Sequence, residues 1–213
     1  MSIDFAQLLS GFAVLLISLT VHEASHAWTA DRLGDSTARL LGRISLNPAV
    51  HIDPIGTILF PLIAMVTNLP LIGWAKLVPV NSARLGSNWR QKFMLIAAAG
   101  PASNLVLAVI AAIVLRLVAP VGVDGDGAGL SARLISGFEL AVFVNVLLAV
   151  FNMVPIPPLD GGNVLAGLLT GPAAATFDRL RPYGFVILYG LMLTGWLTTI
   201  ISPPASFLLS WLL

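Results

Sequence analysis

Long apolar stretches constrain the fold of this chain more than any other feature. A helix needs about 20 apolar residues to cross a bilayer. Stretches of about that length run over residues 5–30, 93–118, 134–154 and 183–201. The sequence therefore predicts an all-α polytopic membrane protein with about four transmembrane helices.

The composition excludes several other classes of protein. Only 10% of the 213 residues are charged and 57% are hydrophobic, whereas a soluble domain carries roughly 25% charged residues. The mean hydropathy is +0.93. Such a chain cannot keep enough polar surface in water, which excludes a soluble domain and a disordered chain. A net charge of +1 offers no attraction to a polyanion, so we expect no nucleic-acid partner.

A fifth apolar stretch, residues 55–75, differs from the others. Pro61 and Pro70 interrupt it, and proline removes a backbone donor and kinks a helix. Irregular backbone is tolerated at membrane depth only where protein covers it. We therefore expect a re-entrant or interfacial hairpin here. The whole chain, 1–213, is expected to form one membrane-embedded domain, with a core over 8–169, a C-terminal helix over 183–201 and a short tail.

The first predicted span ends in the sequence His22-Glu23-Ala24-Ser25-His26. Positions i and i+4 of a helix share a face, so both imidazoles can reach one metal ion. Glu23 would lie beside that ion as a general base. The alternative is a pair of interfacial histidines that are hydrogen-bonded to neighbours. Ionisable groups at membrane depth are costly and usually functional, which favours the metal site.

A catalytic zinc ion needs a third protein ligand. Asp160 has the best context, since prolines precede it and Gly161-Gly162 follow, which permits an unwound helix end and close backbone approach. The alternative is that Asp160 caps the next helix, and this context fits both interpretations. The other candidates are Glu139, His51 and Asp53.

Three motifs together resemble the signatures of the site-2 protease family, which are intramembrane zinc metalloproteases. They are the HEASH sequence, the sequence Gly100-Pro101-Ala102-Ser103-Asn104, and the sequence NMVPIPPLDGG over 152–162. The resemblance covers residues 8–169. Stretches over 42–48, 51–57 and 73–81 resemble a compact prokaryotic branch without a PDZ domain, although Leu77 stands where that branch usually has a proline.

The resemblance implies that His22, His26 and Asp160 bind one Zn²⁺ ion, that Glu23 activates water, and that Asn152 helps to hold the substrate. The implied function is an intramembrane zinc endopeptidase that cuts transmembrane protein substrates within the lipid bilayer. A metal-binding transporter is one alternative, but repeated halves with matching broken helices are not seen in the sequence. A non-catalytic scaffold is the other, and it would be free to lose Glu23. The sequence does not specify an oligomeric state.

The site also predicts an orientation. His22 and Asp160 must meet at one depth from the ends of spans that run in the same direction, so 55–75 should not cross. Nine of the eleven basic residues then lie on the active-site side, and only Arg116 and Arg133 lie on the other. Cytoplasmic loops carry excess Lys and Arg. We expect a prokaryotic cell membrane, with the N-terminus outside and the active site nearer the cytoplasmic face.

Substrate binding is expected in two places. Residues 74–81, with alternating Lys76, Val78 and Val80, predict a short β element whose edge binds an unwound substrate segment. Its candidate substrate-binding residues are Trp74, Lys76, Val78 and Asn81. The alternative is an interfacial loop anchored by Trp74.

Water must also reach a site inside the bilayer, so we expect a polar channel from the cytoplasm. Its candidate lining residues are Ser25, Thr29, Asn145 and Asn152. For Asn145 an interhelical hydrogen bond is the favoured alternative.

Overall fold

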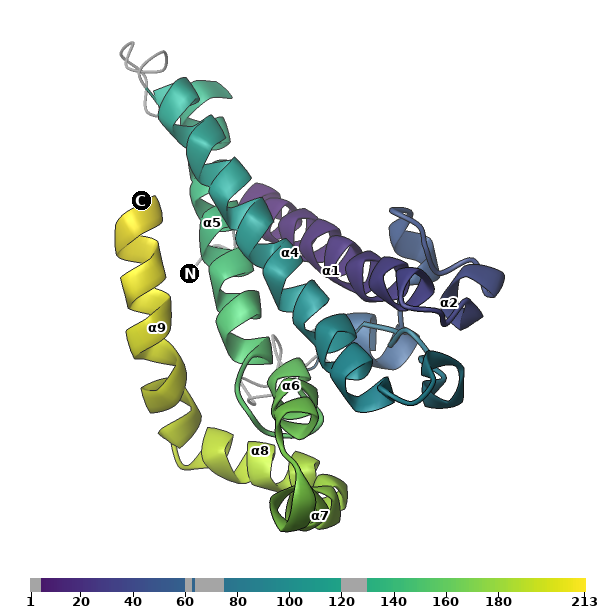
Figure 1. Cartoon of the computed structure of the whole chain (residues 1–213). Helices are drawn as coiled ribbons and strands as arrows, with labels where there is room; N and C mark the ends of the chain where they lie inside the picture. The colour runs from purple at the N-terminus through teal and green to yellow at the C-terminus, as the bar shows by residue number, and fades with distance from the viewer. Residues whose placement is uncertain (1–4, 60–62, 64–74, 120–129) are drawn as a thin grey trace.

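The computed structural model describes residues 5–59, 63, 75–119 and 130–213. This part of the chain is largely helical and contains no β-strand. Three long helices dominate it (Figure 1): α1 (Phe5–Arg32), α4 (Trp89–Val118) and α5 (Leu130–Asn152). The all-α prediction is confirmed for the described residues.

Helix α4 is the centre of the bundle. It packs against α1, α5 and α6 (Asp160–Leu168), as Figure 1 also shows. Its buried positions are mostly small, among them Gly100, Ala108 and Ala112. Small side chains let helix backbones approach closely, which is how helices associate where lipid supplies no hydrophobic driving force. Val142 and Val146 of α5 are fully buried in the same core.

Two described helices are long and apolar enough to cross a membrane: α4 and the segment Ala132–Asn152 of α5. A third crossing is possible if the bent pair Gly171–Leu193 and Trp196–Leu212 is one span. The predicted count of four spans is therefore not confirmed. Helix α1 contains the first predicted span as one helix, but its second half carries the HEASH sequence and is less apolar.

The C-terminal region departs from the predicted straight helix over 183–201. Helices α7 (Gly171–Leu180) and α8 (Gly184–Leu193) are joined by the short η5 (Arg181–Tyr183), and α9 spans Trp196–Leu212. The chain bends by 80° before α9, where Gly195 takes a left-handed φ of +77°. Glycine is the residue that adopts such a φ without strain.

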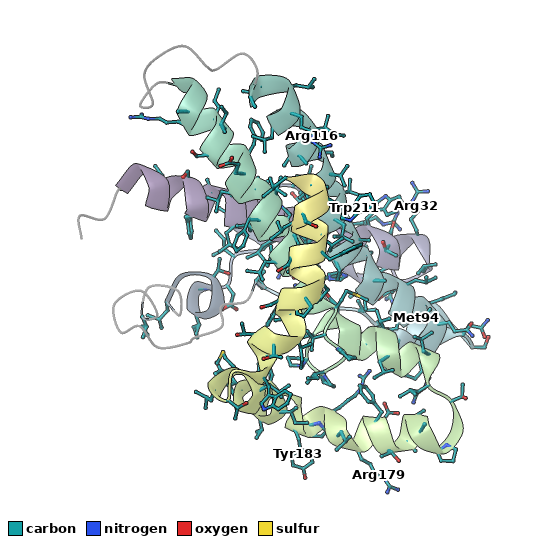
Figure 2. The ribbon with its side chains drawn as sticks, turned by 90° about the vertical axis from the view of Figure 1, so that its left-hand side faces the viewer. Arg32, Met94, Arg116, Arg179, Tyr183 and Trp211 are labelled. Atoms are coloured by element: carbon teal, nitrogen blue, oxygen red, sulfur yellow. The ribbon has the colours of Figure 1, made fainter. Side chains whose placement is uncertain are left out.

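The predicted helix stops at residue 201, but Pro203 and Pro204 lie inside a helix. Helix α9 continues through both to Leu212, because its packing outweighs the lost backbone bonds. Leu197, Ile201 and Ala205 lie four residues apart on one face and are buried in the core that α5 shares. At its far end, Arg116 of α4 donates a hydrogen bond to the Trp211 carbonyl at 3.1 Å, and Figure 2 shows these two residues next to each other.

Between α1 and α4 the described elements are short: α2 (Thr37–Leu40), η1 (Pro48–Val50), η2 (Pro54–Leu59) and η3 (Ser82–Leu85). Most of the predicted hairpin over 55–75 lies outside the described residues, as does Trp74. The predicted β element is not found over Ala75–Asn81, which has no regular secondary structure. We call Ala75–Asn81 the strap. Its amides bond to side chains and to a loop rather than to a partner strand, so no ladder forms.

Candidate metal centre

Helix α1 brings two imidazoles to one point. The Nε2 atoms of His22 and His26 lie 3.0 Å apart, and both rings are buried. The Oδ2 atom of Asp160 lies 3.1 Å from the Nε2 of His22 and 3.4 Å from that of His26. The i, i+4 spacing on α1 and the first residue of α6 therefore supply three ligand atoms to one small volume.

Hydrogen bonds on the far side of each ring fix which nitrogen carries the proton. His26 Nδ1 lies 2.7 Å from the Ile96 carbonyl oxygen, which can only accept, so Nδ1 carries a proton and the Nε2 of the neutral ring presents a lone pair. His22 Nδ1 lies 2.6 Å from the Asn104 Oδ1 in the same way. In the neutral rings, two imidazole lone pairs and a carboxylate face one another. Such a convergence of acceptors favours a bound cation.

The spacing of the three atoms fits zinc. Zinc binds nitrogen at about 2.0–2.1 Å and oxygen at about 2.0–2.2 Å in a tetrahedron, which places neighbouring ligands about 3.3 Å apart. The distances between the three ligand atoms, 3.0, 3.1 and 3.4 Å, lie close to that value. Two histidines and one carboxylate leave a fourth position open, as catalytic zinc sites do.

Helix α4 shapes the centre at three positions four residues apart. The Ile96 carbonyl binds His26, and the Asn104 side chain binds His22. Gly100 lies between them and provides the space for both rings. A Cβ atom at Gly100 would lie 2.4 Å from His26 Nε2 and 2.6 Å from His22 Cε1. The Gly100–Asn104 motif is therefore explained by the packing of α4 on the two histidines.

The glycines after Asp160 have a similar role. A Cβ atom on Gly161 would lie 2.3 Å from the Met153 carbonyl oxygen, and one on Gly162 would lie 2.7 Å from the Pro157 nitrogen. Helix α6 can therefore begin directly against the 153–157 turn that follows α5. Because α6 begins so close to this turn, the Asp160 carboxylate at its first residue lies next to the histidines of α1.

Glu23 is buried beside the centre and contacts the strap. Its Oε2 accepts a hydrogen bond from the Val78 backbone amide at 3.2 Å. The Lys76 amide donates to the His51 carbonyl at 2.9 Å. These two amides, two residues apart, both face the body of the protein, as alternate residues of an extended chain do. The strap thus crosses the face of α1 that presents Glu23.

Asp35 anchors the other end of the strap. Its carboxylate accepts hydrogen bonds from the Asn81 amide at 2.6 Å and from the Thr37 amide and hydroxyl at 3.0 and 2.5 Å. Burial alone would raise the pKa of the Asp35 carboxyl. These hydrogen bonds, together with the charge of Arg84, hold that pKa below its usual value.

Comparison with known proteins places this geometry in a family. A model of peptidase family M50 matches residues 10–131 and 115–193. The chain belongs to peptidase family M50. The site-2 protease resemblance is thereby confirmed.

Several relatives of this chain carry zinc in their names. "Putative zinc metalloprotease YwhC" of Bacillus subtilis is 37% identical over 180 residues, which cover 84% of this chain and 78% of the relative. "Putative zinc metalloprotease Rip2" of Mycolicibacterium smegmatis is 33% identical and is covered over 64% of its length. Its namesake in Mycobacterium tuberculosis is 28% identical over 197 residues, with 90% of this chain and 70% of the relative covered. No solved structure matches this chain. Zinc is the metal that both the donor set and the names of these relatives indicate.

The other sequence candidates for a metal ligand lie outside the group of three. His51 is buried with its Nε2 2.9 Å from the Ser45 carbonyl oxygen. Asp53 accepts hydrogen bonds from the amides of Ile55 and Gly56 at the start of η2. Glu139 is exposed on α5. Of the four candidates, Asp160 is the one that the fold carries to the histidines.

The positions of the candidate substrate and channel residues do not by themselves indicate contact with a substrate or with water. Asn152 ends α5 and donates from Nδ2 to the Leu148 carbonyl at 3.0 Å. Ser25 donates to the Val21 carbonyl of its own helix, and Thr29 is half-buried. Asn145 is buried in an interhelical hydrogen bond with Asn104, which was the favoured alternative.

The sequence motifs left two site residues without a role, Gly100 and Asn104. Their four-residue spacing was the available signal, since it places them on one face of the second predicted span. Only the packing of α4 on α1 shows that this face touches the histidines.

Proposed function

We propose that this chain is an intramembrane zinc endopeptidase that hydrolyses peptide bonds in or near transmembrane segments of membrane proteins. The observation that carries the proposal is the convergence of His22, His26 and Asp160. Glu23, the residue after His22 in the chain, is buried as well. A structural site would be closed by a fourth protein ligand. The described part of the chain brings three.

Each residue has a role in this proposal. His22, His26 and Asp160 hold the metal, which when bound polarises a carbonyl and lowers the pKa of water. Glu23 takes the proton from the attacking water and returns it to the leaving amine. The strap amide of Val78 holds one carboxylate oxygen, which leaves the other to accept the proton.

Substrate binding is proposed at the outer edge of the strap and at Asn152. Because the amides of Lys76 and Val78 face inward, an extended strap turns the Leu77 amide and carbonyl outward. The Leu77 side chain is also exposed. An unwound substrate segment can pair with this edge. The Asn152 Nδ2 donates to the Leu148 carbonyl, which leaves its side-chain oxygen to accept a further backbone hydrogen bond.

The main experiment is cleavage of a model transmembrane substrate by purified protein. Wild-type protein should cut it, a zinc chelator should stop the reaction, and added zinc should restore it. Glu23→Gln is the matched variant, because it keeps the shape of the side chain and cannot serve as a base. Equal cleavage by wild-type protein and Glu23→Gln would refute the protease assignment.

Two variants at Leu77 test the strap separately. Leu77→Pro introduces the residue that is usual at this position in the compact branch and removes the outward amide. In this chain it should raise KM, since it removes a bond made to the substrate backbone. Leu77→Ala removes the side chain alone and is the control. If Leu77→Pro cleaves with the KM of Leu77→Ala, the substrate does not bond to the Leu77 amide.

The charge distribution supports an orientation with the N-terminus outside and the metal centre nearer the cytoplasm. The chain has no cysteine, so single cysteines report position without background. Arg133→Cys should be labelled by a membrane-impermeant reagent added to intact cells, and Arg84→Cys only after lysis. The opposite pattern would reverse the orientation.

A further inference from the structure

A buried hydrogen-bonded chain lies behind His22 and joins three helices. Asn104 of α4 is completely buried and Asn145 of α5 is 3% exposed. The Asn104 Nδ2 donates to the Ser18 carbonyl of α1 at 3.3 Å and to the Asn145 Oδ1 at 2.9 Å. The Asn104 Oδ1 faces His22 Nδ1 at 2.6 Å.

The partners leave Asn104 only one orientation. A backbone carbonyl can only accept, so the Asn104 nitrogen must face Ser18. Asn145 is oriented in turn, because its own nitrogen donates to the Ala141 carbonyl at 2.9 Å and its oxygen therefore faces Asn104. With both donors of Asn104 directed away, its oxygen is the atom that meets His22. The Asn104 oxygen accepts a hydrogen bond from the Nδ1 proton of His22. The Nε2 lone pair of the neutral His22 ring then faces His26 and Asp160.

We propose that Asn104 is a positioning residue for the metal ligand His22, and that Asn145 supports it from α5. The inference rests on the proposed zinc site and deepens it, because it names the group that fixes the ring orientation and tautomer of one ligand. Partners of this kind behind a metal-binding histidine change metal affinity by about 10–100-fold when they are removed. A residue that only held helices together would change stability and leave metal affinity in the folded protein unaltered.

The experiment compares zinc affinity with thermal stability in the full-length protein in detergent. Zinc affinity is measured by competition with a chelating dye, and the visible absorption of the cobalt-loaded protein reports ligand geometry. Asn104→Leu should bind zinc about 10–100-fold more weakly than wild-type protein and alter the cobalt spectrum. If Asn104→Leu does not fold, Asn104→Ala replaces it with the same expected loss.

Asn104→Asp separates the two roles of the side chain. It keeps an oxygen acceptor for His22 but places a carboxylate against the Ser18 carbonyl and the Asn145 oxygen. It should therefore lower the melting temperature while binding zinc more tightly than Asn104→Leu. Asn145→Leu should lose less zinc affinity than Asn104→Leu, because the Ser18 carbonyl still orients Asn104.

The outcomes are distinguishable from failure of the proposed function. A wild-type protein that binds no zinc refutes the metal site itself. Zinc affinity that is equal in wild-type protein and folded Asn104→Leu overturns the positioning role alone. Zinc affinity that simply follows melting temperature through the whole series also overturns it.

Discussion

Gly100→Ala is a one-carbon change with a large expected effect, because of where the carbon would lie. The new Cβ would stand 2.4 Å from His26 Nε2 and 2.5 Å from its Cε1, whereas ordinary van der Waals contact begins at about 3.4 Å. The ring must therefore retreat by about 1 Å or α4 must move away. Neither ring moves freely, since His26 is bonded to the Ile96 carbonyl and His22 to Asn104.

The size of the effect follows from the tolerance of a zinc site. Metal-to-ligand distances are held within about 0.2 Å, so a shift of about 1 Å places the Gly100→Ala ligands far outside that range. Overpacking a core typically costs about 1–3 kcal/mol. If this strain falls on the metal-loaded state, zinc affinity drops about 5- to 150-fold. Cleavage at limiting zinc should fall by a similar factor.

Gly137→Ala is the matched control. A Cβ atom at Gly137 meets nothing within 4 Å, and alanine in a helix interior is favoured over glycine by about 0.5–1 kcal/mol. This variant should keep wild-type zinc affinity and lose no stability. Zinc titration of both variants decides the matter. Wild-type affinity in folded Gly100→Ala would show that α4 does not pack on the imidazoles as described.

Three further variants test other parts of the structure. Asp160→Asn should weaken zinc binding more than Gly137→Ala does, because it removes the one charged ligand, and dye competition measures it. Asp35→Asn should lower the melting temperature, since it weakens the anchor that holds Asn81. The pKa of Asp35 is lowered in the folded protein. Its stabilising contribution is therefore present above the unfolded pKa of about 3.9 and is lost only as the pH falls through the lower folded value. The contribution of Asp35 to the melting temperature should stay constant between about pH 5 and pH 8. Arg90→Gln breaks a half-exposed ion pair with Asp178 and should cost less than about 1 kcal/mol of unfolding free energy.

The local part of the metal centre was predictable from the sequence. The spacing of His22 and His26 requires only that α1 be a helix, and α1 is continuous from Phe5 to Arg32. The prolines and glycines around Asp160 predicted an unwound helix end and a close backbone approach, but they fitted a helix cap as well as a metal ligand. The assignment of Glu23 as the base and of Asn152 as a substrate ligand stays a prediction.

The remaining features depend on contacts between distant segments. The predicted helix stopped at residue 201, before Pro203 and Pro204, but burial of Leu197, Ile201 and Ala205 against the core keeps α9 intact. Alternation of side chains over 74–81 suggested a strand, yet a strand needs a partner. The described strap instead bonds through single amides to His51, Glu23 and Asp35.

The two histidines differ in a way that matters for altering the metal centre. His26 is supported by the main-chain carbonyl of Ile96, which is present whatever side chain position 96 carries. His22 is supported by a side chain, Asn104, which a single codon can change. The metal centre therefore has one ligand whose support is fixed by the backbone and one whose support is open to mutation. Substitutions at position 104, by selection or by design, can therefore tune metal affinity gradually. The support of His26 by the Ile96 carbonyl offers no side chain to substitute in the same way.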